Sequence, residues 1–355
     1  MKKTYKLLIV LLIIIAFAIG IILSYNILIK KERTLKIYNW SYYIDESVIK
    51  SFEEKYGVKV IYDTYEESGE AFAKLKIGGG GYDVIYISDS FLKQAIKEGY
   101  VQKIDHSKIP NFKNIDEELI NNPYDNGLSY SIPYMWGSVG IGVNTKYVKE
   151  EIKGWKQLFD EEFLKKYNGK ISMLEDFIDT INAVKFYLKI PLNDWSKESV
   201  EKIKELLKKQ REYLAGYWGA SQYIPGLVKG EVYIAQAWSG DILIAKDEEE
   251  AIKYILPEEG TVRFIDFMVI PKGSENVDLA YKWINFLLEP EIAEKNTRAV
   301  HYTNSLKREL MPNDLLQESA LYPSEELMKK LQFEPILTEE EIKIVEEITI
   351  EVKGA

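Results

Sequence analysis

Short apolar runs alternate with helix-like patterns along most of the chain. Leu35 and Ile37 alternate with polar neighbours, which predicts a strand, and apolar residues then recur at helical spacing over residues 48–56. A cap at Asp45 or Ser47 would start that helix. Further strands are predicted at residues 58–65, 84–87, 171–174, 232–237 and 267–270, and further helices at 68–77, 89–98, 176–190, 196–213 and 279–288. This order predicts a largely parallel sheet with helices on both faces.

Glycines interrupt this pattern at two places. Residues 130–144 contain a proline and several glycines within apolar runs, and they are predicted to be strands broken at those positions. The glycines at 78–81 lack the Lys-Ser/Thr that follows the glycines of a phosphate-binding loop, so they are interpreted as a flexible turn. Residues 144–263 then repeat the α/β pattern. Two closely joined α/β units predict a cleft between two lobes, where small ligands bind.

Residues 39–43, Asn-Trp-Ser-Tyr-Tyr, lie where the first predicted strand is followed by a helix. Three of these five side chains are aromatic. In open α/β sheets, ligands bind at the carboxyl ends of the strands. This stretch is therefore a candidate binding loop, although a loop with half-buried tyrosines would contain the same residues.

The amino terminus contains a long uncharged segment. Residues 7–29 consist almost entirely of apolar residues. As a helix this segment would be about 34 Å long, enough to cross a bilayer. A secretory signal peptide is the alternative, because Ala16-Phe17-Ala18 resembles a cleavage site, but cleavage there would leave an apolar run at 19–23. We therefore expect an uncleaved hydrophobic helix that anchors an exported protein.

The composition of the 355-residue chain excludes several kinds of chemistry. The chain has no cysteine, which excludes disulfides, thiolate metal sites and a cysteine nucleophile. The only histidines are His106 and His301, so histidine-based catalysis has little material. Residues 1–33 carry a net charge of +5 within a formal total of −10, which leaves −15 for residues 34–355. An acidic exported domain favours small cations over nucleic acid as ligands.

Acidic and aromatic residues are the candidates for a site. Asp176 and Asp179 follow a predicted strand and would lie one turn apart on one helix face, although helix capping also explains acids there. Asp266 lies inside an apolar run, where a charge is costly unless it is paired. The aromatic candidates near strand ends are Trp40, Tyr43, Trp136, Trp238 and Tyr302.

Carboxylates and aromatic faces together can bind organic ammonium groups. Each charge-assisted hydrogen bond from an ammonium to a carboxylate is worth about 1.5–3 kcal/mol, and an aromatic face adds about 0.5–2 kcal/mol. The same residues contain no nucleophile–base pair and no cluster with metal-ligand spacing, so they predict binding without a metal or cofactor rather than catalysis. A glycosidase that uses Asp176/Asp179 or Asp179/Asp266 is the catalytic alternative.

With these residues in view, the chain resembles the spermidine/putrescine-binding proteins of bacterial polyamine ABC transporters. The resemblance covers about residues 35–335 and rests, in order, on the stretches IYNWSYY, KVIYDTYE, AKLK, GYDV, KEGYVQKID, YSIPYMWGSVGIGVN, GEVYIAQAW, INFLLEP and LYP. It implies an α/β, two-lobed periplasmic-binding-protein fold of type II-like topology, with the ligand cleft between the lobes. The implied parts are an N-terminal segment at 1–33, a first lobe from 34–142 and 265–310, and a second lobe from 143–264 and 311–355.

The resemblance also implies which residues contact the ligand. The matching positions are Trp40, Ser41, Tyr43, Ser88, Asp176, Asp179, Trp238, Asp266, Tyr302 and Glu334. By resemblance the aspartates bind ammonium groups and the aromatic residues enclose the alkyl chain. This chain departs from the family at Tyr42, where some members have an acid, at Ser90, where they have a tyrosine, and at Phe264, where they have a tryptophan. A family glutamine aligns with Glu334 or, if a gap is placed, with Gln332.

The function implied by the resemblance is that of an extracytoplasmic polyamine-binding subunit of an ABC importer. Its lobes would close on spermidine or putrescine and deliver it to the permease subunits. We expect no enzymatic activity, no cofactor and no nucleic-acid partner, and we expect a monomer in the periplasm or at the outer face of the cell membrane, anchored by residues 7–29. The alternatives are a protein of the same fold for a different small solute, and a ligand sensor.

Overall fold

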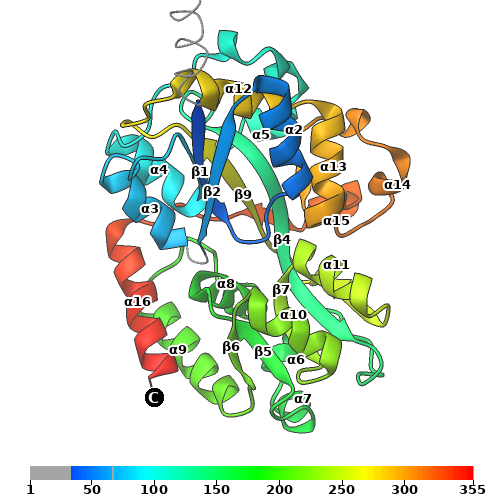
Figure 1. Ribbon diagram of the computed structural model, residues 1–355. Coiled ribbons are helices and arrows are strands. Elements are labelled where there is room, and N and C mark those ends of the chain that lie inside the picture. Colours follow the sequence, from blue (N-terminus) through cyan, green and yellow to red (C-terminus); the bar gives the residue numbers. More distant parts are fainter. Residues whose placement is uncertain (1–32, 66–67, 355) are drawn as a thin grey trace, which may run out of the picture.

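Two hydrophobic cores divide the protein into two lobes, at the top and the bottom of Figure 1. The computed structural model describes residues 33–65 and 68–354. The first core is built mainly from residues 35–135 and 265–322, and the second from residues 139–262 with Ile348 and Val352. The two-lobed α/β fold implied by the resemblance is therefore confirmed.

The first lobe begins with parallel β–α–β units. Strand β1 (Thr34–Trp40) pairs in parallel with β2 (Lys59–Tyr65) and β3 (Val84–Ser88). Asp45 caps the following helix by accepting a 2.8 Å hydrogen bond from the backbone N–H of Ser47, which decides between the two predicted caps. The other elements of this lobe are α2 (Glu46–Tyr56), α3 (Ser68–Lys76), α4 (Asp89–Lys97), α5 (Glu117–Ile120), α12 (Val277–Leu287), α13 (Pro290–Val300), β10 (Thr303–Asn304), α14 (Asn313–Leu316) and short 3-10 helices at His106–Lys108, Pro110–Asn114 and Arg308–Leu310.

Three strands connect the lobes. The long strands β4 (Ile132–Asn144) and β9 (Thr261–Val269) run antiparallel to each other, and both cores include residues from each of them. The short strand β11 (Leu331–Phe333) follows α15 (Glu325–Met328) and pairs in parallel with β9. It leads to the last helix, α16 (Glu339–Lys353), which packs against the second lobe (Figure 1).

Strand β4 is continuous, so the prediction of broken strands over residues 130–144 is wrong. Its pairing with β9 has one irregularity, between Pro133 and Met135. The glycines of this strand allow close packing: a Cβ atom on Gly140 would lie 2.5 Å from the Tyr254 ring, and one on Gly142 would lie 2.3 Å from Ile242. The glycines at 78–81 do form a turn, with positive φ angles between 58° and 94°.

The second lobe is also built from parallel strands and helices. Strand β5 (Ile171–Leu174) pairs in parallel with β6 (Gly216–Trp218) and β7 (Ile234–Trp238), while β8 (Ile252–Ile255) pairs antiparallel with β4. Its helices are α6 (Trp155–Phe159), α7 (Glu161–Lys166), α8 (Phe177–Leu188), α9 (Lys197–Arg211), α10 (Ala220–Lys229) and α11 (Ser239–Glu248).

The sheet is mixed rather than largely parallel. Its main strand order is β2-β1-β3-β9-β4-β7-β5-β6. The pairs β3–β9, β9–β4 and β4–β7 are antiparallel, because β4 leaves the first lobe and β9 returns to it. The prediction of parallel pairing holds for β2-β1-β3 and for β7-β5-β6, and it fails for β3–β9 and for every pair that includes β4.

Two implied lobe boundaries also differ from the cores. Val139 and Ile141, expected in the first lobe, belong to the second core, and residues such as Met311 and Tyr322, expected in the second lobe, belong to the first.

The expected hydrophobic helix at 7–29 lies outside the described residues. Within residues 33–65 and 68–354, no helix is both long and apolar enough to span a bilayer.

Candidate ligand-binding site

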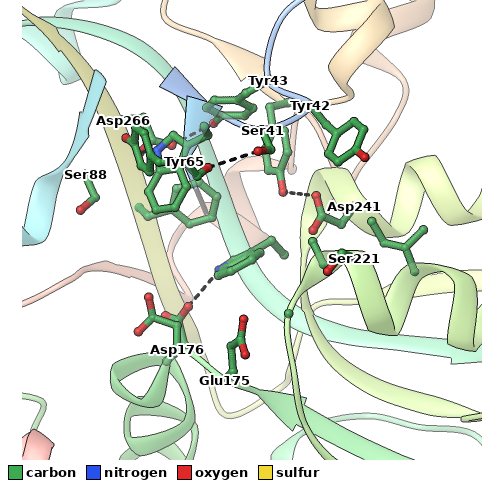
Figure 2. A pocket seen from close by; sticks show the side chains of 18 of the residues that line it. Ser41, Tyr42, Tyr43, Tyr65, Ser88, Glu175, Asp176, Ser221, Asp241 and Asp266 are labelled. Atoms are coloured by element: carbon green, nitrogen blue, oxygen red, sulfur yellow. Dashed lines mark hydrogen bonds between the residues drawn. The ribbon is translucent and has the colours of Figure 1, made fainter. Parts of the chain in front are cut away.

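A cavity of about 410 Å³ lies between the lobes, and it is lined by residues at strand ends and helix starts. All ten positions named from the resemblance line it: Trp40, Ser41, Tyr43, Ser88, Asp176, Asp179, Trp238, Asp266, Tyr302 and Glu334. In Figure 2, Asp266 and Asp176 lie on opposite sides of the aromatic side chains, and Asp241 lies to one side. The roles of the ten residues as ligand contacts stay predictions.

Asp266 is held at the first-lobe side of the cavity. Strand β9 places it opposite Ser88 of β3, and only 5% of its surface is exposed. The indole N–H of Trp40 donates to its Oδ1 atom at 3.0 Å, and the Tyr43 hydroxyl donates to its Oδ2 atom at 2.9 Å. Burial raises the pKa of Asp266 to about 7. Asp266 was expected to be costly in this apolar run unless it was paired. Its carboxyl group accepts hydrogen bonds from two donors and lines the cavity.

The second lobe contributes Asp176 and Asp179 from the start of α8. Asp176 occupies the N-cap position, but its side chain accepts no capping hydrogen bond, so capping does not explain this residue. Asp179 is 6% exposed and accepts a 2.9 Å hydrogen bond from the indole N–H of Trp238. Burial, followed by the charge of Asp176, raises the pKa of Asp179 well above its usual range.

Glu334 lines the cavity beside α8. It follows β11, so its position depends on the third connection between the lobes. Its Oε1 atom accepts a 3.2 Å hydrogen bond from Asn182, and its backbone carbonyl accepts a 2.8 Å hydrogen bond from the Tyr124 hydroxyl. The alternative residue, Gln332, is exposed and does not line the cavity.

Three further acids line the cavity and were not predicted as site residues: Asp89, Glu175 and Asp241. Asp241 of α11 accepts hydrogen bonds from the hydroxyls of Tyr223 and, at 2.6 Å, Tyr302. The sequence signal for Asp241 was its position three residues after Trp238, the residue that ends β7.

Asp89 is fully buried at the start of α4. Its oxygens accept hydrogen bonds from the backbone N–H groups of Ile265 at 3.0 Å and Ser90 at 2.9 Å. Burial raises the pKa of Asp89 to about 7. The available signal was an acid directly after a buried strand, but an acid in the first turn of a helix is also explained by the helix dipole.

Aromatic rings form the walls between these acids. The rings of Trp40 and Tyr65 lie 4.5 Å apart, and Tyr43 meets Tyr302 edge-on at 5.0 Å. Trp136, which was expected near a strand end, lies within β4 and does not line the cavity. The structure therefore brings together four of the five aromatic candidates.

The cavity is acidic throughout. Seven carboxyl side chains line it, and none of its described lining residues is Lys, Arg or His. Both histidines lie outside it, and His301 pairs with Asp247 at 2.8 Å. Over the described part of the chain, no group of three or more His, Cys, Asp or Glu residues could hold a metal ion. This arrangement attracts cations that are long enough to use several carboxylates and apolar enough to lie between aromatic rings.

The comparisons with known proteins agree with this geometry. The chain matches the model of the bacterial extracellular solute-binding protein family over residues 47–320. It is 36% identical to the putrescine-binding periplasmic protein SpuD of Pseudomonas aeruginosa, over 86% of this chain and 88% of that protein. It is 32% identical to the spermidine/putrescine-binding periplasmic protein of Escherichia coli, over 84% of this chain and 85% of that protein. A solved structure, of a putative spermidine/putrescine ABC transporter from Listeria monocytogenes, has a TM-score of 0.84 and 29% identity, and the match covers 91% of this chain and 99% of that one.

Proposed function

This chain belongs to the bacterial extracellular solute-binding proteins, and we propose that it binds polyamines outside the cytoplasm for an ABC importer. Curated relatives are named as putrescine-binding or spermidine/putrescine-binding periplasmic proteins. One observation of this chain carries the proposal: a cavity with seven carboxyl groups, aromatic walls and no basic side chain. A polyamine carries several ammonium groups on a methylene chain and fits both features.

The carboxyl groups would bind the ammonium groups in two regions of the cavity. Asp266 would take one ammonium group, because Trp40 and Tyr43 fix its carboxyl group and leave it at the cavity surface. Asp176 and Asp179 would take another on the α8 side. Each charge-assisted hydrogen bond is worth about 1.5–3 kcal/mol. Trp238 and Tyr302 would cover the methylene groups between these regions.

Other solutes fit this cavity less well. An amino acid needs a cation for its carboxylate, and no basic side chain among the described residues lines the cavity. A sugar would call for more amide and guanidinium groups at the strand ends. A ligand sensor with the same site is the second candidate function, and it would differ from an importer subunit in its membrane partner.

The proposal includes the transport cycle. The lobes would close on the ligand by bending at the three connecting strands, and the closed protein would present the ligand to the permease subunits. A monomeric state, the permease partner and the membrane anchor at residues 7–29 stay predictions.

Calorimetric titration of the purified protein with putrescine and spermidine tests the proposal, with arginine and maltose as controls. We expect binding of a polyamine at one site per chain, at micromolar or lower Kd, and no binding of either control. Absence of polyamine binding by the folded protein would refute the proposed ligand class.

A further inference from the structure

Asp179 and Glu334 are two buried acids that line the same end of the cavity. They come from different parts of the chain, α8 and the segment after β11, and they are 6% and 5% exposed. Asp179 Oδ2 accepts a hydrogen bond from Trp238, and Glu334 Oε1 accepts one from Asn182. Within the described chain, the second oxygen of each carboxyl group has no protein donor. Each side chain therefore keeps one oxygen for another partner.

The surroundings supply almost no positive charge to this pair. The polar groups that interact electrostatically with this pair or donate to it are Asp176 and Asn182 of α8, Asp89 of α4, Trp238 of β7, and the hydroxyls of Tyr124, Tyr223 and Tyr254. The cations of neighbouring elements have other partners: Arg263 of β9 pairs with Glu118 at 2.9 Å and lies 4.0 Å over the Phe333 ring, and Lys353 of α16 donates to the backbone carbonyl of Glu175 at 3.1 Å. Two carboxylates in a buried site of this kind do not both ionise without a cation.

We propose that Asp179 and Glu334 form one ammonium subsite that holds a proton when the cavity is empty, and that the ligand replaces this proton with an ammonium group. This inference rests on the proposed function. When the ammonium nitrogen donates hydrogen bonds to both carboxylates, the displaced proton passes to the solvent. Net charge in the subsite is then the same before and after binding.

The neighbouring amide suits both protonation states of Glu334. Asn182 is 1% exposed, and its Oδ1 atom has no hydrogen-bond partner among the described residues. Its Nδ2 group donates to ionised Glu334, while a rotated amide would present Oδ1 to the hydroxyl of protonated Glu334. Burial, followed by the charges of Asp179, Asp89 and Asp176, also raises the pKa of Glu334 well above its usual range.

Proton release can be counted directly. Calorimetric titration of the full-length protein with spermidine, at one pH in phosphate and in Tris buffer, separates the heat of binding from that of buffer protonation. We expect net proton release, and an association constant that rises with pH by up to about tenfold per unit for each proton released. The Glu334→Gln variant should release about one proton fewer per ligand, and its affinity should depend less on pH.

A matched variant separates the subsite from a general change in charge. Glu326 is exposed on α15 and does not line the cavity, so Glu326→Gln should release as many protons as the wild type. Spermidine binding with the same proton release in wild type and Glu334→Gln would overturn the inference and leave the proposed function intact.

Two other experimental outcomes also have a defined meaning. Absence of polyamine binding by the wild type would refute the proposed function itself. If thermal denaturation shows that Glu334→Gln does not fold, the wild-type titrations can still overturn the inference, because binding without proton release excludes a displaced proton.

Discussion

Asp266→Asn removes the charge of the carboxyl group that Trp40 and Tyr43 hold at the cavity surface. The amide has nearly the same size, so this change tests charge rather than packing. One ligand ammonium group would lose a buried charged partner, which costs about 2–4 kcal/mol, a factor of roughly 30–1000 in Kd. The empty variant should still fold, because burial raises the pKa of Asp266 to about 7 and thus already disfavours the ionised form.

Calorimetric titration with putrescine and spermidine measures this loss. Asp63→Asn is a matched control: Asp63 also accepts a hydrogen bond from a tyrosine, Tyr82 at 2.8 Å, but it lies on the exposed surface outside the cavity. The control should bind with the wild-type Kd. Wild-type Kd in Asp266→Asn would refute the assignment of this carboxyl group to the ligand.

Three other predictions follow from the same contacts. Trp238→Phe keeps a ring but removes the N–H that donates to Asp179 at 2.9 Å, so calorimetry should show a roughly three- to tenfold higher Kd. Relative to Asp266→Asn, the empty wild-type protein should lose free energy of unfolding, measured with urea, as pH rises from about 4 to above 7, because folding raises the pKa of Asp266 from 3.8 to about 7 and its contribution is complete only below the unfolded pKa. Gly240→Ala would place a Cβ atom 2.5 Å from the Tyr302 ring; it should lower the free energy of unfolding by about 1–3 kcal/mol and weaken binding.

Each of these predictions has its own control or contrary result. Trp195→Phe removes a buried indole N–H outside the cavity that has no acceptor among the described residues, so it should leave the Kd unchanged. Gly69→Ala adds a methyl group with no atom within 4 Å, so it should not lower stability. An empty wild-type protein that gains stability relative to Asp266→Asn between pH 4 and 7 would contradict the raised pKa of Asp266.

Part of the cavity lining was predictable because the acidic and aromatic candidates lie at strand ends, which alternation and composition indicate in a sequence, whereas Ser88 and Glu334 were named only from the resemblance. Asp266 was visible as one acid in an apolar run. Asp89 and Asp241 were missed because an acid in the first turn of a helix serves the helix dipole in most proteins. The hydrogen bond from Asn182 to Glu334 joins residues that are 152 positions apart, and no local pattern indicates it.

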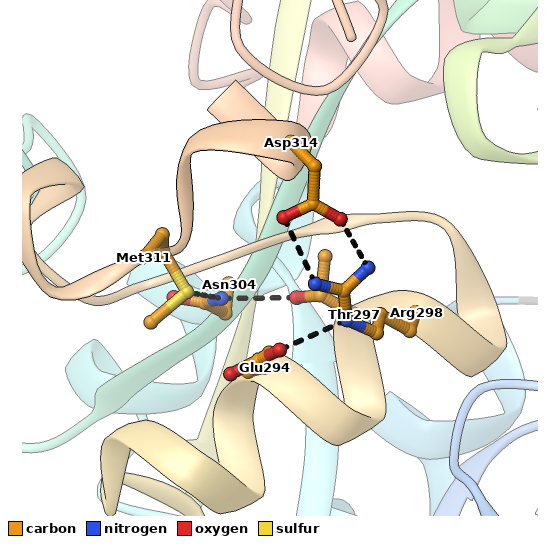
Figure 3. Close-up of polar contacts among 6 residues, drawn as sticks. All are labelled: Glu294, Thr297, Arg298, Asn304, Met311 and Asp314. Carbon is orange, nitrogen blue, oxygen red and sulfur yellow. Dashed lines mark hydrogen bonds and ion pairs between the residues drawn. The ribbon is translucent and has the colours of Figure 1, made fainter. Parts of the chain in front are cut away.

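The fold was predictable in its local elements but not in its long-range pairing. The lobe boundary expected at residue 311 is wrong because side chains of the segment after it contact α13 of the first lobe. Arg298 pairs with both oxygens of Asp314 at 2.7 and 3.1 Å, and Asn304 lies 3.0 Å from the Met311 sulfur (Figure 3). Side-chain contacts of this kind do not change the spacing of apolar residues along the chain, so the sequence contains no pattern that predicts them.

The position of β9 has a consequence for the order in which the chain can fold during synthesis. This strand lies between β3 and β4 in the sheet, yet the ribosome makes it only after nearly the whole second lobe. Until then β3, whose apolar side chains are buried in the folded protein, has an open edge on that side. Unpaired apolar edges promote aggregation, and late long-range pairing slows folding. We therefore expect such a chain to gain from a chaperone that keeps it unfolded until β9 has been synthesised.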